Sequence, residues 1–318
     1  MHRYLSLLLL SVVGAGFCRA LPPLPLAPGT EKILEDIYAG RSDAAIQEAQ
    51  ELQKESPEHP LGYVLEAETL WWKIWIASAE YKYGMTLARH REKAPGDQHY
   101  LELAGKALAL AEASLKKRES AEMYFYAGMA EALQARLYGL RWESRNTARV
   151  AIHARENFTR ALALDPGLAD AEMGLGLYNY YVDTLSTMAR VLRFVMGIPG
   201  GSKEEGVRLL QRAIREGQIT PVAASFYLAI NLHNYDQKYE EALRVLTPLV
   251  GKFSENALFL LAQGDLYAKL GRRPQALAAY HEAEAAAEKV SDAAMQKKLE
   301  MLVHESVAAV NGGLAGKR

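Results

Sequence analysis

The sequence predicts an all-α fold in which antiparallel pairs of helices stack side by side into a solenoid. From residue 31 onward Ala, Leu, Glu, Lys and Arg dominate, apolar residues recur at spacings of three and four, and no segment alternates as a β-strand would. Small and large residues also recur in a fixed order, which is typical of repeats. A chain of 318 residues would ordinarily form about two domains, but repeats grow by stacking, so we expect one elongated domain over residues 31–310.

The first 20 residues are typical of a secretory signal peptide. A short basic start that includes Arg3 precedes an apolar run ending at Phe17, which is shorter than the roughly 20 residues that span a bilayer. Ala20 offers a small residue at the cleavage point. We therefore expect an extracytoplasmic chain, periplasmic or secreted. Two alternatives stay open: anchoring in the membrane through the uncleaved segment, and lipid attachment at Cys18, although Phe17 is large for the residue before a lipidated cysteine.

Composition excludes several classes of protein. A net charge of −1 lacks the excess of Lys and Arg of a general nucleic-acid binder. The single cysteine, Cys18, excludes an intramolecular disulfide and a Cys-rich metal site. Beyond the N-terminus no apolar run is long enough to span a bilayer, so membrane association is allowed but not required. The sequence does not indicate an oligomeric state.

The helical region carries a unit of small, large and small residues at offsets of 0, 4 and 7. Two clear copies are Ala154, Phe158 and Ala161, and Ala276, Tyr280 and Ala283. Small residues let two antiparallel helices approach closely, and the large residue fills the gap to the next pair. Twenty-two residues after the first residue of a unit a second small residue follows, Gly176 in one copy and Gly264, with Tyr267 behind it, in another.

This pattern resembles the tetratricopeptide repeat, whose period of 34 residues separates Ala242 from Ala276. The resemblance is strongest over 257–286 and extends over 150–180 and 236–270. It implies a right-handed superhelix of helix pairs in which the first helices present exposed side chains to a concave groove. The second helices would build the outer wall.

The elements follow from the repeat and from local stop signals. Residues 21–30 are rich in Pro and predict an extended linker, whereas 311–318 predict a flexible tail. Between them we expect about six helix pairs and a final capping helix near 292–310. Several periods exceed 34 residues, and this stretching predicts long first helices, namely 61–91, 121–142 and 171–196. Ser202-Lys203-Glu204-Glu205 is a capping box that marks the start of a helix.

A second, weaker likeness covers residues 173–210. Met173-Gly174-Leu175-Gly176-Leu177-Tyr178 and Glu205-Gly206-Val207-Arg208-Leu209-Leu210 are similar to a eukaryotic tetratricopeptide family associated with the mitochondrial outer membrane and with inclusion-body clearance. The predicted export signal does not fit mitochondrial targeting. This likeness therefore supports the fold and not the role.

The sequence contains no signature of an enzyme. The Gly-rich stretch 197–203 has Ser202 where a phosphate-binding loop has its second Gly, and it joins two predicted helices without a strand. None of the eight histidines forms a close pair with metal-ligand spacing. We therefore expect no catalytic residues, no cofactor and no metal.

A basic stripe is the first candidate for partner binding. Arg141, Arg145, Arg149 and His153 recur every four residues and would share one face of a helix. Residues 136–160 hold six Arg and only two Glu, and such a potential suits an acidic peptide or another anionic group. The alternative is a solvated face paired with Glu residues of adjacent helix pairs.

An aromatic cluster is the second candidate. Trp71, Trp72 and Trp75 lie on one predicted helix, which cannot bury both Trp71 and Trp72 on the same face. At least one should therefore lie near the surface or meet another element. Aromatic residues in a groove are frequent anchors for partners, and the alternative is packing inside an overlong helix pair.

Together these features predict an exported, non-enzymatic tetratricopeptide-type scaffold that binds a protein or peptide partner in the cell envelope. The alternative is a small-ligand-binding component associated with a transporter. That alternative requires a deep, partly apolar pocket between the long helices predicted over 61–91 and 171–196.

Overall fold

A computed structural model of the chain describes residues 24–82, 93–184 and 199–312. Throughout these ranges the regular secondary structure is α-helical, as predicted. The predicted signal peptide lies outside the described residues, as do 83–92 and 185–198, which hold the ends of two of the predicted long helices. In the described part of the chain no helix combines the length and the apolar character needed to cross a membrane.

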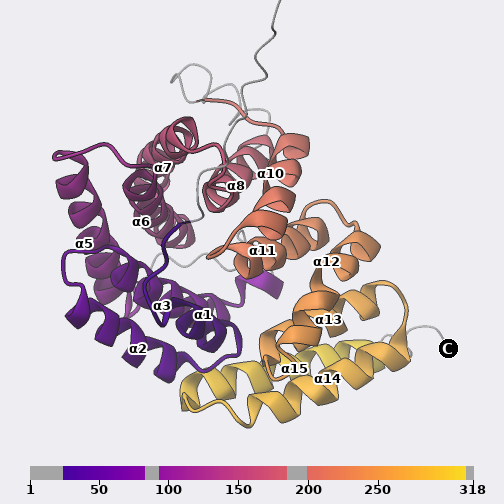
Figure 1. Cartoon of the computed structure of the whole chain (residues 1–318). Helices are drawn as coiled ribbons and strands as arrows, with labels where there is room; N and C mark the ends of the chain where they lie inside the picture. The colour runs from indigo at the N-terminus through magenta and orange to yellow at the C-terminus, as the bar shows by residue number, and fades with distance from the viewer. Residues whose placement is uncertain (1–23, 83–92, 185–198, 313–318) are drawn as a thin grey trace, which may run out of the picture.

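The helices pack against one another in chain order, which is the arrangement of an α-solenoid (Figure 1). The pairs are α1 (Thr30–Tyr38) with α2 (Ser42–Glu55), α3 (Leu61–Ser78) with α5 (Asp97–Leu115), α6 (Ala121–Leu140) with α7 (Ser144–Leu164), α8 (Asp170–Thr184) with α10 (Lys203–Glu216), α11 (Pro221–Asn234) with α12 (Tyr239–Lys252), and α13 (Ala257–Lys269) with α14 (Arg273–Ala287). The final helix, α15 (Ala293–Gly312), packs against α14 and corresponds to the predicted capping helix.

Side-chain caps fix several helix starts. Ser202 accepts a hydrogen bond from the Glu205 backbone N–H at 3.2 Å and begins α10, as the capping box predicts. Asn256 caps α13 in the same way, accepting from the Phe259 N–H at 3.1 Å. The linker before α1 is extended, but its apolar side chains, including Leu26, pack against the core. This part of the Pro-rich segment therefore belongs to the folded body.

Phe158 on α7 fills the gap between its own helix pair and the next one. A Cβ atom on Gly128 of α6 would lie 2.8 Å from the Phe158 ring, and one on Gly174 of α8 would lie 2.0 Å from it. Ala154 and Ala161, on the same face of α7, are 5% and 0% exposed. A large residue between two small ones thus holds three helices together.

The other repeat positions also lie at close helix contacts. Gly176 and Gly206 face each other across α8 and α10, where a Cβ on Gly176 would lie 2.9 Å from the Gly206 carbonyl oxygen. A Cβ on Gly264 would lie 2.4 Å from the ring of Tyr280. The buried or half-buried neighbours in this last pair are Tyr267, Ala276 and Ala283.

The long helices differ from the prediction in two respects. A single helix over 61–91 is wrong, because α3 ends at Ser78 and Ala79 adopts a left-handed backbone with φ of 55° before helical backbone resumes at Glu80. The stretching is also shared between first and second helices: α6 has 20 residues, close to the predicted 121–142, while α5 has 19 and α7 has 21.

The curve of the solenoid closes on its own N-terminal helices (Figure 1). Besides its neighbours in the chain, α3 packs against α15, and the Trp72 ring centroid lies 5.3 Å from that of Phe226 on α11 and 6.0 Å from that of Phe259 on α13. The Asn256 side chain donates to the Tyr38 carbonyl oxygen at 2.7 Å. The first helices therefore pack on one another, whereas the sequence predicted that they present exposed side chains to a groove.

Candidate partner-binding surface

The three tryptophans of the predicted aromatic cluster lie in the centre of the molecule. Trp71, Trp72 and Trp75 are 2%, 5% and 3% exposed. The Trp71 Nε1–H donates to the Tyr227 hydroxyl at 2.7 Å, and the Trp75 ring stacks on Tyr227 with centroids 4.8 Å apart. Adjacent tryptophans are both buried because α3 is surrounded by other helices, so each face of α3 meets a different partner.

A buried ion pair accompanies these rings, and the sequence analysis did not identify it. Arg136 of α6 donates to Glu68 Oε2 at 2.6 Å, and Trp72 Nε1 donates to Glu68 Oε1 at 3.2 Å. The Arg136 guanidinium also lies 5.1 Å from the Tyr227 ring centroid. Burial acts to lower the pKa of Arg136, but the Glu68 carboxylate outweighs it and the pKa is raised above its ordinary value. Both charges are consumed inside the fold.

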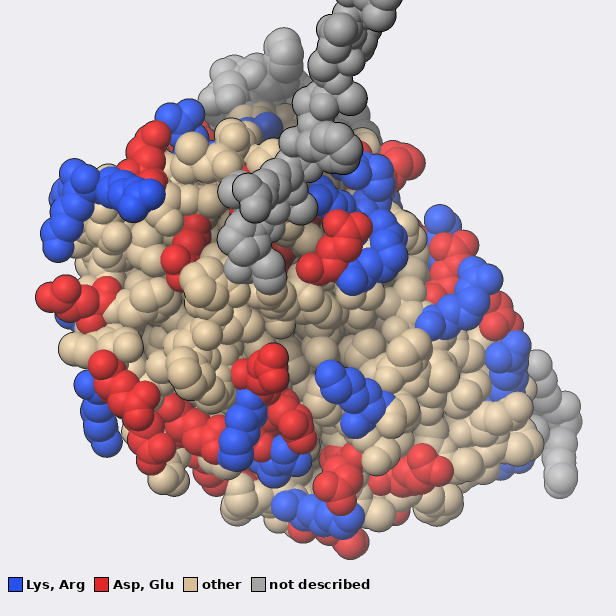
Figure 2. Space-filling view, viewed as in Figure 1, with Lys and Arg blue, Asp and Glu red and all other residues tan. Residues whose placement is uncertain are grey.

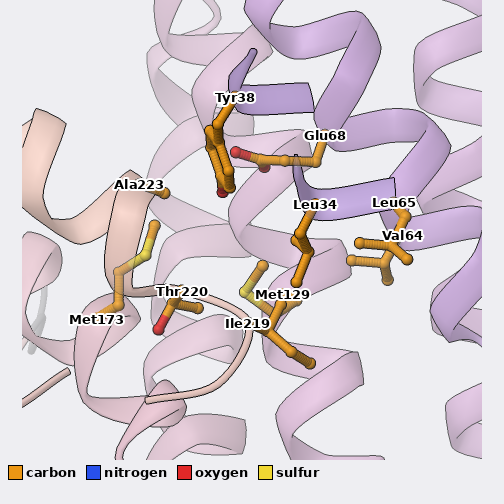
Figure 3. Close-up of a pocket in the computed structure, with 10 residues that line it drawn as sticks. All are labelled: Leu34, Tyr38, Val64, Leu65, Glu68, Met129, Met173, Ile219, Thr220 and Ala223. Carbon is orange, nitrogen blue, oxygen red and sulfur yellow. The ribbon is translucent and has the colours of Figure 1, made fainter. Parts of the chain in front are cut away.

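A small cavity lies beside Glu68 (Figure 3). Its volume is about 10 Å³, which is room for about one water molecule. A second cavity of about 10 Å³ lies between Tyr81, His233 and Asp265. Drug-sized ligands occupy roughly 300–1,000 Å³, so neither cavity is the deep pocket that the small-ligand alternative requires. The lining of the first is Leu34, Tyr38, Val64, Leu65, Glu68, Met129, Met173, Ile219, Thr220 and Ala223.

The predicted basic stripe is divided by the turn between α6 and α7. Arg141 precedes α7, and its guanidinium forms a bidentate pair with Asp97 of α5, with N···O distances of 2.6 and 2.8 Å. Its side chain is 10% exposed. The prediction that Arg141 shares a helix face with the other three residues is therefore wrong, because the chain turns at Trp142 and Arg141 is drawn towards the buried Asp97.

Arg145, Arg149 and His153 do share an exposed face of α7, on the outer wall of the solenoid. Within the described parts of the chain neither arginine forms an ion pair. Other exposed arginines differ: Arg160 pairs with Glu119 at 2.9 Å, for example. The uncompensated charge is therefore local to two successive turns of α7.

Acidic side chains gather on a different element. Figure 2 shows them over α2, where Asp43, Glu51 and Glu55 are exposed. The net charge of −1 thus conceals a separation between an acidic face on α2 and a basic face on α7.

Glu131 of α6 lies beneath the basic face. Its side chain is 7% exposed, its Oε2 accepts from Asn157 Nδ2 at 2.8 Å, and its Oε1 lies 3.5 Å from His153 Nδ1. Burial raises the pKa of Glu131 to about 7, and the Asn157 hydrogen bond and the Arg149 charge only partly oppose this. Near neutral pH Glu131 therefore carries only part of a negative charge and does not neutralise the arginines above it.

Trp142 adjoins the same face, and the sequence analysis did not identify it either. It is 45% exposed and has a φ of 62°, a left-handed conformation that disfavours bulky residues. A signal exists in the sequence: the corresponding turns between α1 and α2 and between α13 and α14 carry Gly40 and Gly271. Trp142 stands where two other helix pairs have glycine.

No protein-family model matches this chain, and no curated protein is significantly similar to it. Within the described residues no group of three or more His, Cys, Asp or Glu side chains is placed to hold a metal ion. The exposed face of α7, with its adjoining turn, is the candidate site that the geometry defines most clearly.

Proposed function

We propose that the chain is an exported scaffold of the tetratricopeptide type that binds an acidic segment of a protein partner through the outer face of α7. The observation that carries this proposal is the exposure of Arg145 and Arg149 on successive turns without an ion pair to any described residue. Uncompensated arginines on a rigid helix are an electrostatic complement to carboxylates.

The spacing of the two arginines suits an extended acidic peptide. Residues four apart on a helix are separated by about 6 Å along its axis, close to the distance between alternate residues of an extended chain. Each guanidinium can then hold one carboxylate through two hydrogen bonds. Exposed pairs contribute roughly 0.2–1 kcal/mol each, so we expect modest, salt-dependent affinity unless further contacts add to it.

Other features support the remaining parts of the proposal. Export rests on the signal-like residues 1–20. The tetratricopeptide type rests on the small–large–small packing around Phe158 and Tyr280. The outer wall is favoured over a groove because Trp72 and its neighbours fill the interior.

The test measures binding of a fluorescein-labelled peptide of alternating Glu and Ser by fluorescence anisotropy. The double variant Arg145→Ala/Arg149→Ala should bind roughly tenfold more weakly than the wild type, and binding should weaken with salt. Arg215→Ala/Arg244→Ala is the matched control, because it removes the same charge from exposed positions on α10 and α12. Equal affinities for the two double variants would contradict the proposal.

A further inference from the structure

The turn that carries Trp142 has the same hydrogen-bond pattern as two other turns of the solenoid. In each, a backbone N–H donates to the carbonyl oxygen five residues earlier, at 2.9 Å. The three bonds are Glu143 to Tyr138, Arg41 to Asp36 and Arg272 to Tyr267. In each turn the residue before the donor is left-handed, with φ values of 62° at Trp142, 82° at Gly40 and 71° at Gly271. Glycine is the residue that this pattern favours.

A bulky side chain at this position is unfavourable for the backbone, since its Cβ crowds the adjacent carbonyl. The other three tryptophans recover much by burial, being 5% exposed or less, whereas Trp142 remains 45% exposed. The fold therefore gains less from the indole of Trp142 than from any of the other three, at a position that would accept glycine.

The surroundings of Trp142 indicate what the side chain could serve. Arg145 follows it by three residues at the start of α7, and Arg149 lies one turn further along the same exposed face. Trp and Arg are the residues that most often dominate the binding energy of protein interfaces. An indole ring beside two uncompensated guanidinium groups offers an apolar contact next to two anion contacts.

We propose that Trp142, Arg145 and Arg149 form one composite surface that takes an acidic peptide segment carrying an apolar side chain. The carboxylates pair with the two guanidinium groups and the apolar side chain packs on the indole ring. This inference rests on the proposed function and adds to it the apolar part of the partner.

Acrylamide quenching of intrinsic fluorescence provides the test, because Trp142 is the exposed one of the four tryptophans. Two peptides without Trp or Tyr serve as probes: an acidic peptide with a central Leu, and the same peptide with Ser in its place. The Leu peptide should protect Trp142 from quenching and bind about tenfold more tightly than the Ser peptide.

Trp142→Gly and Trp142→Asn then separate binding from folding, because both residues tolerate a left-handed backbone. Each variant should bind the Leu peptide as weakly as the Ser peptide, and Trp142→Gly should raise the Tm by about 2 °C. Wild-type affinity of either variant for the Leu peptide would overturn the inference. A lower Tm in both variants would also overturn it, since Trp142 would then be a structural side chain.

The two proposals fail in different ways. If the Ser peptide binds and Arg145→Ala/Arg149→Ala abolishes that binding, while Leu adds nothing, the basic face stands and the aromatic anchor falls. If neither peptide binds the wild type, both proposals fall.

Discussion

At the scale of single residues, Glu131 links the basic face to pH. Its raised pKa means that the folded state binds a proton more tightly than the unfolded state does between about pH 4.5 and 7. Because the unfolded state then binds fewer protons, this group makes stability fall as pH rises through that window.

We therefore expect Glu131→Gln to flatten the dependence of stability on pH. The Gln side chain can still accept from Asn157 but cannot ionise. Tm values measured by circular dichroism between pH 5 and 8 should fall more for the wild type than for Glu131→Gln. Parallel curves for the two proteins would show that the buried carboxyl does not titrate in this range.

Arg136 and Glu68 allow a second prediction at this scale. Arg136→Met should destabilise the fold by about 3–5 kcal/mol, because Glu68 is left buried without its partner. The double variant Arg136→Met/Glu68→Leu should recover most of this loss, although the Trp72 Nε1–H loses its acceptor. Urea denaturation of the two variants gives the comparison, and equal destabilisation would mean that the charges do not act as a pair.

Single residues were predictable from the sequence only where their positions recur. Phe158 and Tyr280 follow from spacing, because each must fill the gap beside a small residue. Trp142 did not, since its importance lies in a backbone angle, and it follows only from comparing its turn with those at Gly40 and Gly271. Arg141 was misplaced because a periodicity of four continues across a helix end.

At the scale of elements, the contact between α7 and α8 depends on the missing side chain of Gly174. A Cβ there would lie 2.0 Å from Phe158, so Gly174→Ala should force the helices apart and cost about 1–3 kcal/mol. Gly105→Ala is the control, because nothing lies within 4 Å of its added Cβ in the middle of α5. That variant should be stabilised by about 0.5–1 kcal/mol, because Ala favours helix more than Gly does.

Chemical denaturation distinguishes the two glycines. Opposite signs are expected, and destabilisation by both substitutions would indicate that helix propensity and packing are not separable at these positions.

Element boundaries were predictable where a side chain caps the helix and less so where tertiary contacts end it. Ser202 marks the start of α10 through its own hydrogen bond. The break at Ala79 has no Gly or Pro to announce it. Just beyond it, the Tyr81 carbonyl accepts from Asn234 and Lys82 donates to the Leu302 carbonyl oxygen of α15, contacts that local sequence does not encode.

At the scale of the whole molecule, the repeat predicted that pairs stack but not how far the stack curves. Curvature depends on the small rotation between successive pairs, and long helices such as α6 and α7 change that rotation without changing the pattern of small residues. The sequence therefore predicted an open groove, whereas the structure has α3 inside it. The ends of the chain are linked as well, since Lys73 of α3 pairs with Asp292 at 2.7 Å.

Closure should make distant parts of this solenoid unfold together, in contrast to an open array in which each repeat contacts only its neighbours. Trp72→Ala should cost about 3–5 kcal/mol, because it removes a ring packed against Tyr38, Phe226 and Phe259. Hydrogen exchange followed by mass spectrometry should then show faster exchange in α11 and α13 as well as in α3. Leu210→Ala, at the contact of α10 with Gly176, is the control for a loss of core volume between sequential neighbours.

For that control, faster exchange should be concentrated in α8, α10 and the helices next to them. If Trp72→Ala likewise loosens only its neighbours in the chain, the interior contacts are too weak to couple the two ends. In that case the solenoid opens in solution, and its inner face becomes accessible to a partner alongside the outer face of α7.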